Sequence, residues 1–317
     1  MWKTVLLLLF TFIVVPVLTF YFDVAPTGLQ WEILKTSGTV YLVFASLCFI
    51  VSTATKNYSQ VDKLWSIMPI AYAWIAYAHA PDTRILLMAI LITIWGVRLT
   101  YNFIRRGGYS WKFWTGEEDY RWAVLRAKPE FQAPWKWFLF NLFFISFYQM
   151  GLIWLMTVPI IKSAGNAPVS GWDYLLFAAG VGFVVFETIA DQQQWNFQNE
   201  KHRLKKEGTI AGTKYAKGFV HDGLWGVMRH PNYFAEQAVW GVIYLFSIAA
   251  TGNWINWSIA GMLLLFVLFK GSSDFSEEIS ASKYPAYTAY QQNVPRYFPL
   301  FGTGGNKAVP AAAEAEE

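Results

Sequence analysis

Residues 84–103 read RILLMAILITIWGVRLTYNF, twenty positions of which only Arg84 and Arg98 carry a charge. A transmembrane helix needs about 20 mostly apolar residues to cross the hydrocarbon core of a bilayer. Other stretches of the chain have the same character, and together they predict eight spans. These are Thr4–Phe22, Ser37–Thr55, Leu64–Ala80, Arg84–Phe103, Lys136–Ile160, Trp172–Ala190, Tyr233–Ala250 and Trp254–Ser272. The third and eighth are short or have polar ends, so seven spans are the alternative.

The composition supports an all-α, polytopic membrane helix bundle. Apolar residues make up 55% of the 317 positions and charged residues only 15%. Many of the 17 Trp, 17 Tyr and 26 Phe lie where apolar and polar stretches meet, as in the aromatic belts at lipid headgroups. The net charge of +4 is small and scattered, which argues against a nucleic-acid partner. The lone Cys48 lies in an apolar run, where a small buried side chain is the simplest interpretation.

The distribution of basic residues predicts the orientation of the chain. With the N-terminus in the cytoplasm, 19 of the 25 Lys and Arg fall in cytoplasmic segments, and only Lys35, Lys162 and Arg84, the first residue of its span, lie in or at the edge of outer connections. This asymmetry follows the positive-inside rule. It places the loops 104–134 and 191–232 and both termini on the cytoplasmic side of the membrane. The expected membrane is that of the endoplasmic reticulum or a bacterial inner membrane. The first span has a signal peptide as its alternative, because Lys3 precedes an apolar core, but no small-residue cleavage site follows closely.

Ionisable groups within spans are costly in hydrocarbon and therefore indicate function by default. Arg98, late in the fourth span, either serves a site or extends its guanidinium to the nearby interface. Glu187, Asp191 and Gln194 share one helical face at the end of the sixth span. They predict a shared ligand or a partner cation, with isolated interfacial acids as the alternative.

The stretch Arg229-His230-Pro231-Asn232-Tyr233, followed by Glu236, predicts the start of the seventh span. Proline suits the first turn of a helix, where its missing N–H is no loss. The unpaired N–H groups and the helix dipole at such a start favour a phosphate or a carboxylate. An ordinary interfacial helix cap is the alternative.

Downstream, Glu277 precedes the aromatic residues Tyr284, Tyr287 and Tyr290. Tyr287 and Tyr290 share a helical face, and their spacing alone favours interface anchors over contacts to a nucleotide. No Gly-x-Gly-x-x-Gly turn, P-loop or Gly-x-Ser-x-Gly elbow occurs in the chain. The four His residues have no metal-ligand spacing, so no metal site is expected.

Taken together, these stretches resemble the steroid 5α-reductase superfamily, and in particular its uncharacterised reductase-like branch. The resemblance covers roughly residues 55–300 in order. Its stretches are Asn57-Tyr58-Ser59-x-Val61-Asp62-x-x-Trp65-Ser66, Trp95-Gly96-Val97-Arg98-Leu99, Gly116-Glu117-Glu118-Asp119-Tyr120-Arg121-Trp122, Asp191-Gln192-Gln193-Gln194, Gly223-Leu224-Trp225, Arg229-His230-Pro231-Asn232-Tyr233-Phe234-x-Glu236 and Lys283-Tyr284-Pro285-x-Tyr287-x-x-Tyr290. The Arg-His-Pro-Asn-Tyr core also occurs in sterol reductases and isoprenylcysteine methyltransferases.

The resemblance implies a membrane oxidoreductase that binds NADPH near the cytoplasmic face and reduces an enone-like C=C bond of a lipid or steroid-like substrate. It also implies one transmembrane domain over residues 1–300, whose part from about 172 to 300 binds the cofactor. The Gly/Ala/Glu-rich composition of the tail 301–317 predicts that it is disordered. Asn232 and Glu236 match the family's cofactor-contacting Asn and Glu, Arg98 matches an Arg of its pattern, and Asp191 falls near polar cofactor contacts. The expected cofactor-binding residues are Arg98, Asp191, Gln194, Arg229, His230, Asn232, Tyr233, Glu236, Glu277, Tyr284 and Tyr287.

The chain departs from the family where steroid reductases polarise the substrate carbonyl with a Glu and a Tyr. Ile67 and Trp95 align with those positions, and neither side chain can transfer a proton. Asp62 and Tyr72 lie nearby in the sequence and are the candidates for the catalytic role.

Two other functions remain open at this point. One is an S-adenosylmethionine-dependent methyltransferase of the isoprenylcysteine type, which would use the same helix start. The other is a non-catalytic lipid-binding membrane protein, an interpretation that the missing Glu and Tyr favour.

Overall fold

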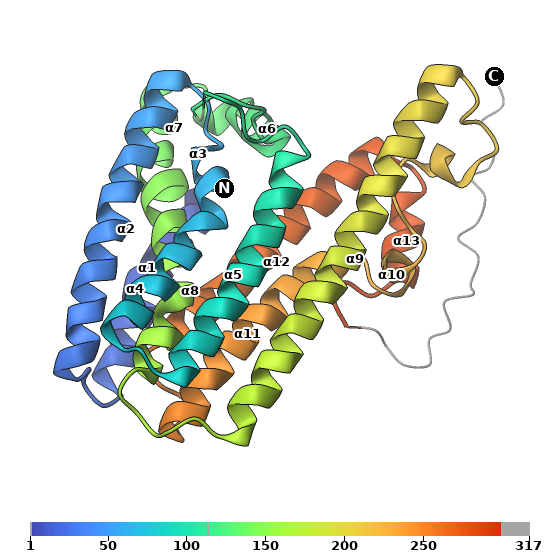
Figure 1. Ribbon diagram of the computed structural model, residues 1–317. Coiled ribbons are helices and arrows are strands. Elements are labelled where there is room, and N and C mark those ends of the chain that lie inside the picture. The colour runs from blue at the N-terminus through green and yellow to red at the C-terminus, as the bar shows by residue number, and fades with distance from the viewer. Residues whose placement is uncertain (1, 113, 299–317) are drawn as a thin grey trace. The chain divides into compact units, whose positions relative to one another are not determined.

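The structure is a computed structural model that describes residues 2–112 and 114–298 (Figure 1). Over these residues the secondary structure is helical and contains no strand, which confirms the predicted all-α class. The expected tail 301–317 lies outside the described residues. The chain forms two compact units: one extends to Val181 and includes Trp240–Leu265, and the other comprises Gly182–Val239 and the chain from Phe266 on.

Six helical segments in the described chain are long and apolar enough to cross a membrane, so the protein is a multi-pass membrane protein. They are Gly28–Thr55, Thr83–Ile104, Pro134–Ser163, Gly171–Glu207, Pro231–Thr251 and Ile259–Lys283. The count of eight spans is not confirmed. The predicted third span corresponds to α4 (Ile67–His79), whose 13 residues rise only about 20 Å. In α1 (Trp2–Tyr21), the apolar stretch Leu6–Tyr21 is also short for a span.

In the first unit, α2 (Gly28–Thr55), α4 and α5 (Thr83–Ile104) pack against α8 (Gln149–Ser163), which is buried along nearly its whole length (Figure 1). Gly261 of α12 (Ile259–Lys283) also lies against α8. A Cβ atom at position 261 would lie 2.2 Å from the carbonyl oxygen of Leu155, so only glycine permits this approach. Small residues at helix contacts serve the same purpose in membrane bundles generally.

The run Pro134–Ser163 is not a uniform α-helix. It begins as α7 (Pro134–Phe140), widens into a π-helix, η2 (Asn141–Tyr148), and continues as α8. The buried Asn141 amide donates to the hydroxyls of Ser52 and Thr53 of α2, each at 3.0 Å. These bonds tie the widened turns to α2. π-Helical turns are rare in proteins, and those that do occur often lie at functional sites.

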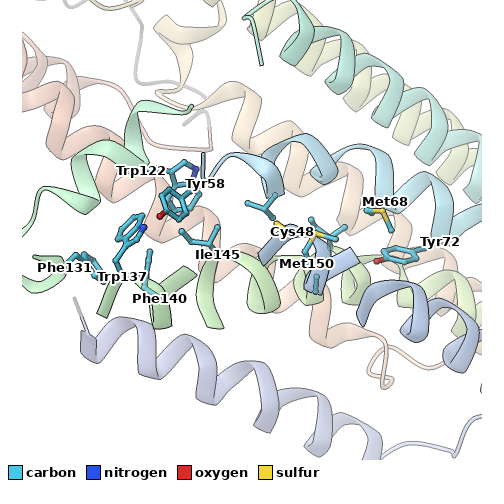
Figure 2. Packing of buried hydrophobic residues seen from close by; sticks show 13 residues of the cluster. Cys48, Tyr58, Met68, Tyr72, Trp122, Phe131, Trp137, Phe140, Ile145 and Met150 are labelled. Carbon is cyan, nitrogen blue, oxygen red and sulfur yellow. The ribbon is translucent and has the colours of Figure 1, made fainter. Parts of the chain in front are cut away.

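Three short helices complete this part of the first unit: α3 (Gln60–Trp65), α6 (Tyr120–Arg126) and η1 (Pro129–Phe131). Aromatic rings near them form one end of a buried cluster (Figure 2). Trp137 packs edge-on against Tyr58 at 5.0 Å and against Phe131 at 5.4 Å between ring centroids. Cys48 belongs to this cluster and is buried and free, as its apolar surroundings in the sequence predicted.

Polar side chains hold the ends of the helices together in the first unit. Thr27 caps α2 by accepting from the backbone N–H of Gln30, and Gln30 accepts from the N–H of Thr27 in return. The Gln30 amide also donates to the carbonyls of Lys162 and Ala164, at 3.0 and 3.1 Å. One side chain thereby connects the start of α2 to the end of α8.

Two ion pairs are almost completely buried in this unit. The Arg84 guanidinium donates to both carboxylate oxygens of Asp173, at 2.6 and 3.0 Å, and to the carbonyl of Pro168 at 3.0 Å. Lys162 donates to Asp23 at 2.7 Å. Arg84 and Asp173 are 3% and 0% exposed, so neither charge has water as an alternative partner.

The second unit contains the later turns of α9 (Gly171–Glu207) and α12, the first turns of α11 (Pro231–Thr251), and three short helices. The short helices are η3 (Lys214–Lys217), α10 (Leu224–Val227) and α13 (Tyr287–Asn293).

The first turns of α12 belong to the first unit, and the helix begins at Ile259, later than the predicted Trp254. The preceding residues form a turn in which the Asn256 side chain accepts from the backbone N–H of Ser258 at 3.1 Å.

Replacing Arg84 by alanine is expected to lower the free energy of unfolding by about 3–5 kcal/mol, because Asp173 would remain buried without its partner. Thermal unfolding of the detergent-purified protein, followed by circular dichroism, measures the change. Arg203→Ala is the control, since Arg203 pairs with Glu200 and Glu207 on the exposed surface of α9. It should leave the unfolding temperature nearly unchanged. Equal losses in the two variants would contradict the importance of the buried pair.

Candidate functional site

The polar residues of the second unit are organised around one buried carboxylate, that of Glu277 on α12. Glu277 is 3% exposed and accepts from Arg229 Nε at 2.9 Å, His230 Nε2 at 2.8 Å and Gln291 Nε2 at 2.9 Å. Arg229 Nη2 and Arg296 Nη2 each donate to its second oxygen at 3.2 Å. These five residues are called the Glu277 cluster below.

Arg229 also binds the chain that follows α13. Its Nη1 donates to the carbonyl of Gln291 at 2.8 Å and to that of Val294. Backbone hydrogen bonds connect the same two segments. The Arg229 N–H donates to the Pro295 carbonyl at 2.9 Å, and the His230 N–H donates to the Arg296 carbonyl at 3.1 Å. Arg229 therefore joins the approach to α11 to the end of the described chain. A phosphate contact by Arg229 stays a prediction.

His230 is 7% exposed and lies between this cluster and an aromatic ring. It stacks on Tyr233 with ring centroids 5.2 Å apart and planes 15° apart. Burial lowers the pKa of His230, although the neighbouring Glu277 acts in the opposite direction. The neutral imidazole can make its contact with the Glu277 carboxylate only when its proton is on Nε2, which then donates.

A second polar group lies at the first turn of α11. Asn232 donates to Asp191 Oδ1 of α9 at 3.2 Å, and its own side-chain oxygen accepts from the backbone N–H of Tyr233 at 3.0 Å. Asp191 and Glu236 are each only 4% exposed. Gln194 lies one turn beyond Asp191, and its Oε1 is buried without a hydrogen-bond partner among the described residues. Four of the predicted residues, Asp191, Gln194, Asn232 and Glu236, thus belong to one unit and combine carboxylate and amide groups.

The tyrosines of α13 belong to the core of the second unit. Tyr287 and Tyr290 are 6% and 1% exposed, and both pack against Phe219, at 4.9 and 5.2 Å. Tyr290 donates its hydroxyl to the carbonyl of Trp225. Burial raises the pKa of Tyr287 to about 12. The preference for interface anchors that their spacing suggested does not describe such buried rings.

Tyr284 lies beside a backbone turn that needs glycine. Gly218 has a φ of +84°, and a Cβ there would lie 2.2 Å from the Tyr284 ring. Lys201 of α9 donates to the Gly218 carbonyl at 3.0 Å and lies 5.8 Å above the ring of Tyr284. Tyr284 thus forms part of the contact between α9 and the connection that follows it.

The remaining predicted residues lie in the first unit. Arg98 is on α5 and is partly buried. Asp62 of α3 accepts from Trp122 Nε1 at 3.0 Å. Burial and the charge of Asp119 raise the pKa of Asp62. Tyr72 of α4 is 2% exposed, and its hydroxyl has no hydrogen-bond partner among the described residues.

A catalytic role for Asp62 or Tyr72 stays a prediction. Trp122, the partner of Asp62, lies at one end of the buried cluster and Tyr72 at the other (Figure 2). Of the two, only Tyr72 has an unused polar atom in the core.

Gln291 and Arg296 are members of the Glu277 cluster that sequence reasoning missed. They lie 14 and 19 residues after Glu277, beyond the turn between α12 and α13. No periodicity connects residues across such a turn. Among the residues that the structure describes, no three His, Cys, Asp or Glu side chains are grouped to hold a metal ion.

Comparison with known proteins places the chain in a family. Residues 48–294 match the family described as "Protein of unknown function (DUF1295)". The chain belongs to the DUF1295 family. The uncharacterized protein C594.04c of Schizosaccharomyces pombe is 36% identical over 271 residues, which cover 81% of this chain and 77% of the yeast protein. The match to the DUF1295 family includes every element from α3 to α13 and ends one residue after α13.

A more distant relative carries a functional name. The "Probable 7-dehydrocholesterol reductase" of Acanthamoeba polyphaga mimivirus is 30% identical over 99 residues, which cover 28% of this chain and 20% of the viral protein. This likeness is consistent with a steroid reductase-like family. No solved structure matches the DUF1295 chain significantly.

The lowered pKa of His230 predicts how stability depends on pH. Because the folded protein disfavours the protonated form of His230, the unfolded chain takes up the proton more readily as the pH falls below about 6.5. The unfolding temperature should therefore decline between pH 7.5 and pH 5, and His230→Gln should decline less steeply. His202→Gln, at an exposed position of α9, is the control and should follow the wild type. Parallel profiles for wild type and His230→Gln would contradict the prediction.

Proposed function

We propose that this protein is a membrane-embedded oxidoreductase that uses NADPH to reduce a C=C bond in a lipid or steroid-like substrate. The observation that carries the proposal is the polar group at the start of α11, where Asn232 bonds to Asp191 near the unpartnered Gln194 Oε1. The relative named as a probable sterol reductase supports the same class of reaction. The cofactor part of the site would lie within residues 172–300 of one transmembrane domain.

The chemistry of these side chains fits the donor groups of NADPH. The cofactor carries amide, amine and hydroxyl hydrogens, which need acceptors in a buried site. Gln194 Oε1 is an unused buried acceptor, and Asp191 and Glu236 add carboxylate oxygens. An acceptor left without a partner costs about 1–3 kcal/mol, so a ligand that supplies the missing hydrogen bond recovers that energy.

The charges around Glu277 suit the anionic part of NADPH. Arg229, Arg296 and Lys270 are linked by ion pairs to only two carboxylates, those of Glu277 and Asp274. One positive charge is therefore in excess within this network. Such an excess favours a polyanion, and the basic loops predicted to face the cytoplasm, where we place both termini, would act in the same direction.

Reduction of a C=C bond needs a hydride at one carbon and a proton at the other. Bound NADPH would supply the hydride, and water would supply the proton. From this chain, the Tyr72 hydroxyl is our candidate for the hydrogen-bond donor to the substrate carbonyl, because no described residue occupies it. A donor directed at the oxygen where charge develops stabilises the enolate-like transition state. Asp62, which already accepts from Trp122, is the weaker candidate.

Cofactor binding tests the proposal directly. The thermal shift of the detergent-purified protein is measured with NADPH, NADH and S-adenosylmethionine. We expect NADPH to stabilise the protein most. A shift with S-adenosylmethionine alone would indicate a methyltransferase, and no shift with any of the three would favour a non-catalytic lipid-binding protein.

Substitution of two residues should weaken NADPH binding specifically. Asn232→Ala and Gln194→Ala should each raise the Kd for NADPH by about 10- to 100-fold, as expected when a hydrogen bond to a charged or buried group is lost. Isothermal titration in detergent measures the affinity. Asn196→Ala is the matched control, because Asn196 is an exposed amide on the same helix, α9, and contacts Gln192. Equal affinity in all variants would exclude this location for the cofactor.

A further inference from the structure

A cavity of about 400 Å³ lies in the first unit, and none of its lining residues is among those proposed to bind the cofactor. Its lining includes Thr53, Tyr58, Arg126, Trp137, Phe138 and Asn141. The volume falls within the range of ordinary small-molecule sites. Tyr58, Trp137 and Phe131 form one wall and are drawn at the left of the buried cluster in Figure 2.

One hydrogen-bond donor in this wall has no partner. Trp137 is 6% exposed, and its indole Nε1 is buried without an acceptor among the described residues. A buried indole N–H normally finds a partner, since leaving it unpaired costs about 1–3 kcal/mol. Trp137 lines the cavity, so a ligand with an acceptor oxygen that reaches the indole N–H would satisfy this donor.

Arg126 supplies a positive charge at the same place. Its guanidinium lies 5.3 Å from the ring centroid of Tyr58 and 5.7 Å from that of Trp137. Its Nη2 donates to Glu118 at 3.1 Å, and Glu118 also accepts from the Tyr58 backbone N–H at 2.9 Å. Further N–H groups of Arg126 remain for a ligand. Arg126 is the one charged side chain among the described lining residues, and Glu118, with which it pairs, does not line the cavity. An anion is therefore the ligand whose charge complements this lining.

The cavity lies where two apolar helical segments end. Helix α2 ends at Thr55, two residues beyond Thr53, and the apolar run Pro134–Ser163 begins next to Trp137. The ends of such segments lie near the lipid headgroups. Phe138, which lines the cavity, is 46% exposed and packs on Phe49 of α2 at 5.2 Å. A ligand here has a polar wall at one side and an exposed apolar surface at the other.

We propose that this cavity binds an anionic phospholipid by its phosphate-bearing headgroup. The phosphate oxygens accept from Trp137 Nε1–H and from the Arg126 guanidinium, and an acyl chain leaves along Phe138 and Phe49. A phosphocholine headgroup fits less well, because its quaternary ammonium would share the cavity with Arg126. The bound lipid would fasten the start of the Pro134–Ser163 run to α2, next to the π-helical turns.

The test compares lipids and variants in detergent. Palmitoyl-oleoyl phosphatidylglycerol, phosphatidylcholine with the same acyl chains, and inorganic phosphate are titrated while the thermal shift and the lipid retained in native mass spectrometry are recorded. We expect phosphatidylglycerol to bind most tightly. Trp137→Phe keeps the ring and removes the N–H, and Arg126→Gln removes the charge. Each should weaken phosphatidylglycerol binding at least about tenfold.

Trp135→Phe is the matched control, since Trp135 lies on the same helix, is 61% exposed and does not line the cavity. It should bind phosphatidylglycerol as the wild type does, and NADPH affinity should be the same in all three variants. Unchanged phosphatidylglycerol binding in Trp137→Phe or in Arg126→Gln, or equal binding of phosphatidylcholine, would overturn the proposal. An equal shift with inorganic phosphate alone would show a site for free anions instead. If Trp137→Phe does not fold, Arg126→Gln decides the outcome.

Discussion

The Glu277 carboxylate determines how the second unit is organised. It is buried on α12, and a buried charge is tolerated only when it is paired and its oxygens are hydrogen-bonded. Arg229 and Arg296 supply the pairing, and His230 and Gln291 complete the hydrogen bonds. Because these partners come from the start of α11, from α13 and from the chain after it, one side chain fixes three segments. The Arg-His-Pro stretch is therefore held in position before any ligand is considered.

The same physical rule operates in the first unit. The Arg84–Asp173 and Lys162–Asp23 pairs are buried near helix ends, and each joins segments that are distant in the sequence. A buried ion pair adds little net stability, because desolvation of the two charges offsets their attraction. An arrangement of helices that separated the partners would leave a buried charge unpaired, so these pairs favour the observed arrangement. Apolar packing of α8 and the close approach at Gly261 supply the rest of the constraint.

Local features of the fold were predictable from the sequence, and distant partners were not. The fourth predicted span, Arg84–Phe103, agrees with α5 within one residue at each end, because its apolar run is uninterrupted and Asp82 caps it. The third was wrong in length, since a polar turn at Ser66 separates α3 from α4. The partners of Glu277 were not predictable, because Arg229 precedes it by 48 residues and Arg296 follows a turn. Helical periodicity carries no information over such separations.

Three of the buried polar atoms that have no hydrogen-bond partner among the described residues belong to the proposed sites. Gln194 Oε1 belongs to the second unit, as do Asn232 and Asp191, and Trp137, whose Nε1 is the second such atom, lines a cavity in the first. The Tyr72 hydroxyl is a third such atom, in the core around α8. Each costs free energy in the unliganded fold, and a packed apolar side chain would avoid that cost. In our proposals, the Gln194 acceptor meets a donor group of the cofactor, and the Trp137 and Tyr72 donors meet a lipid phosphate and a substrate carbonyl.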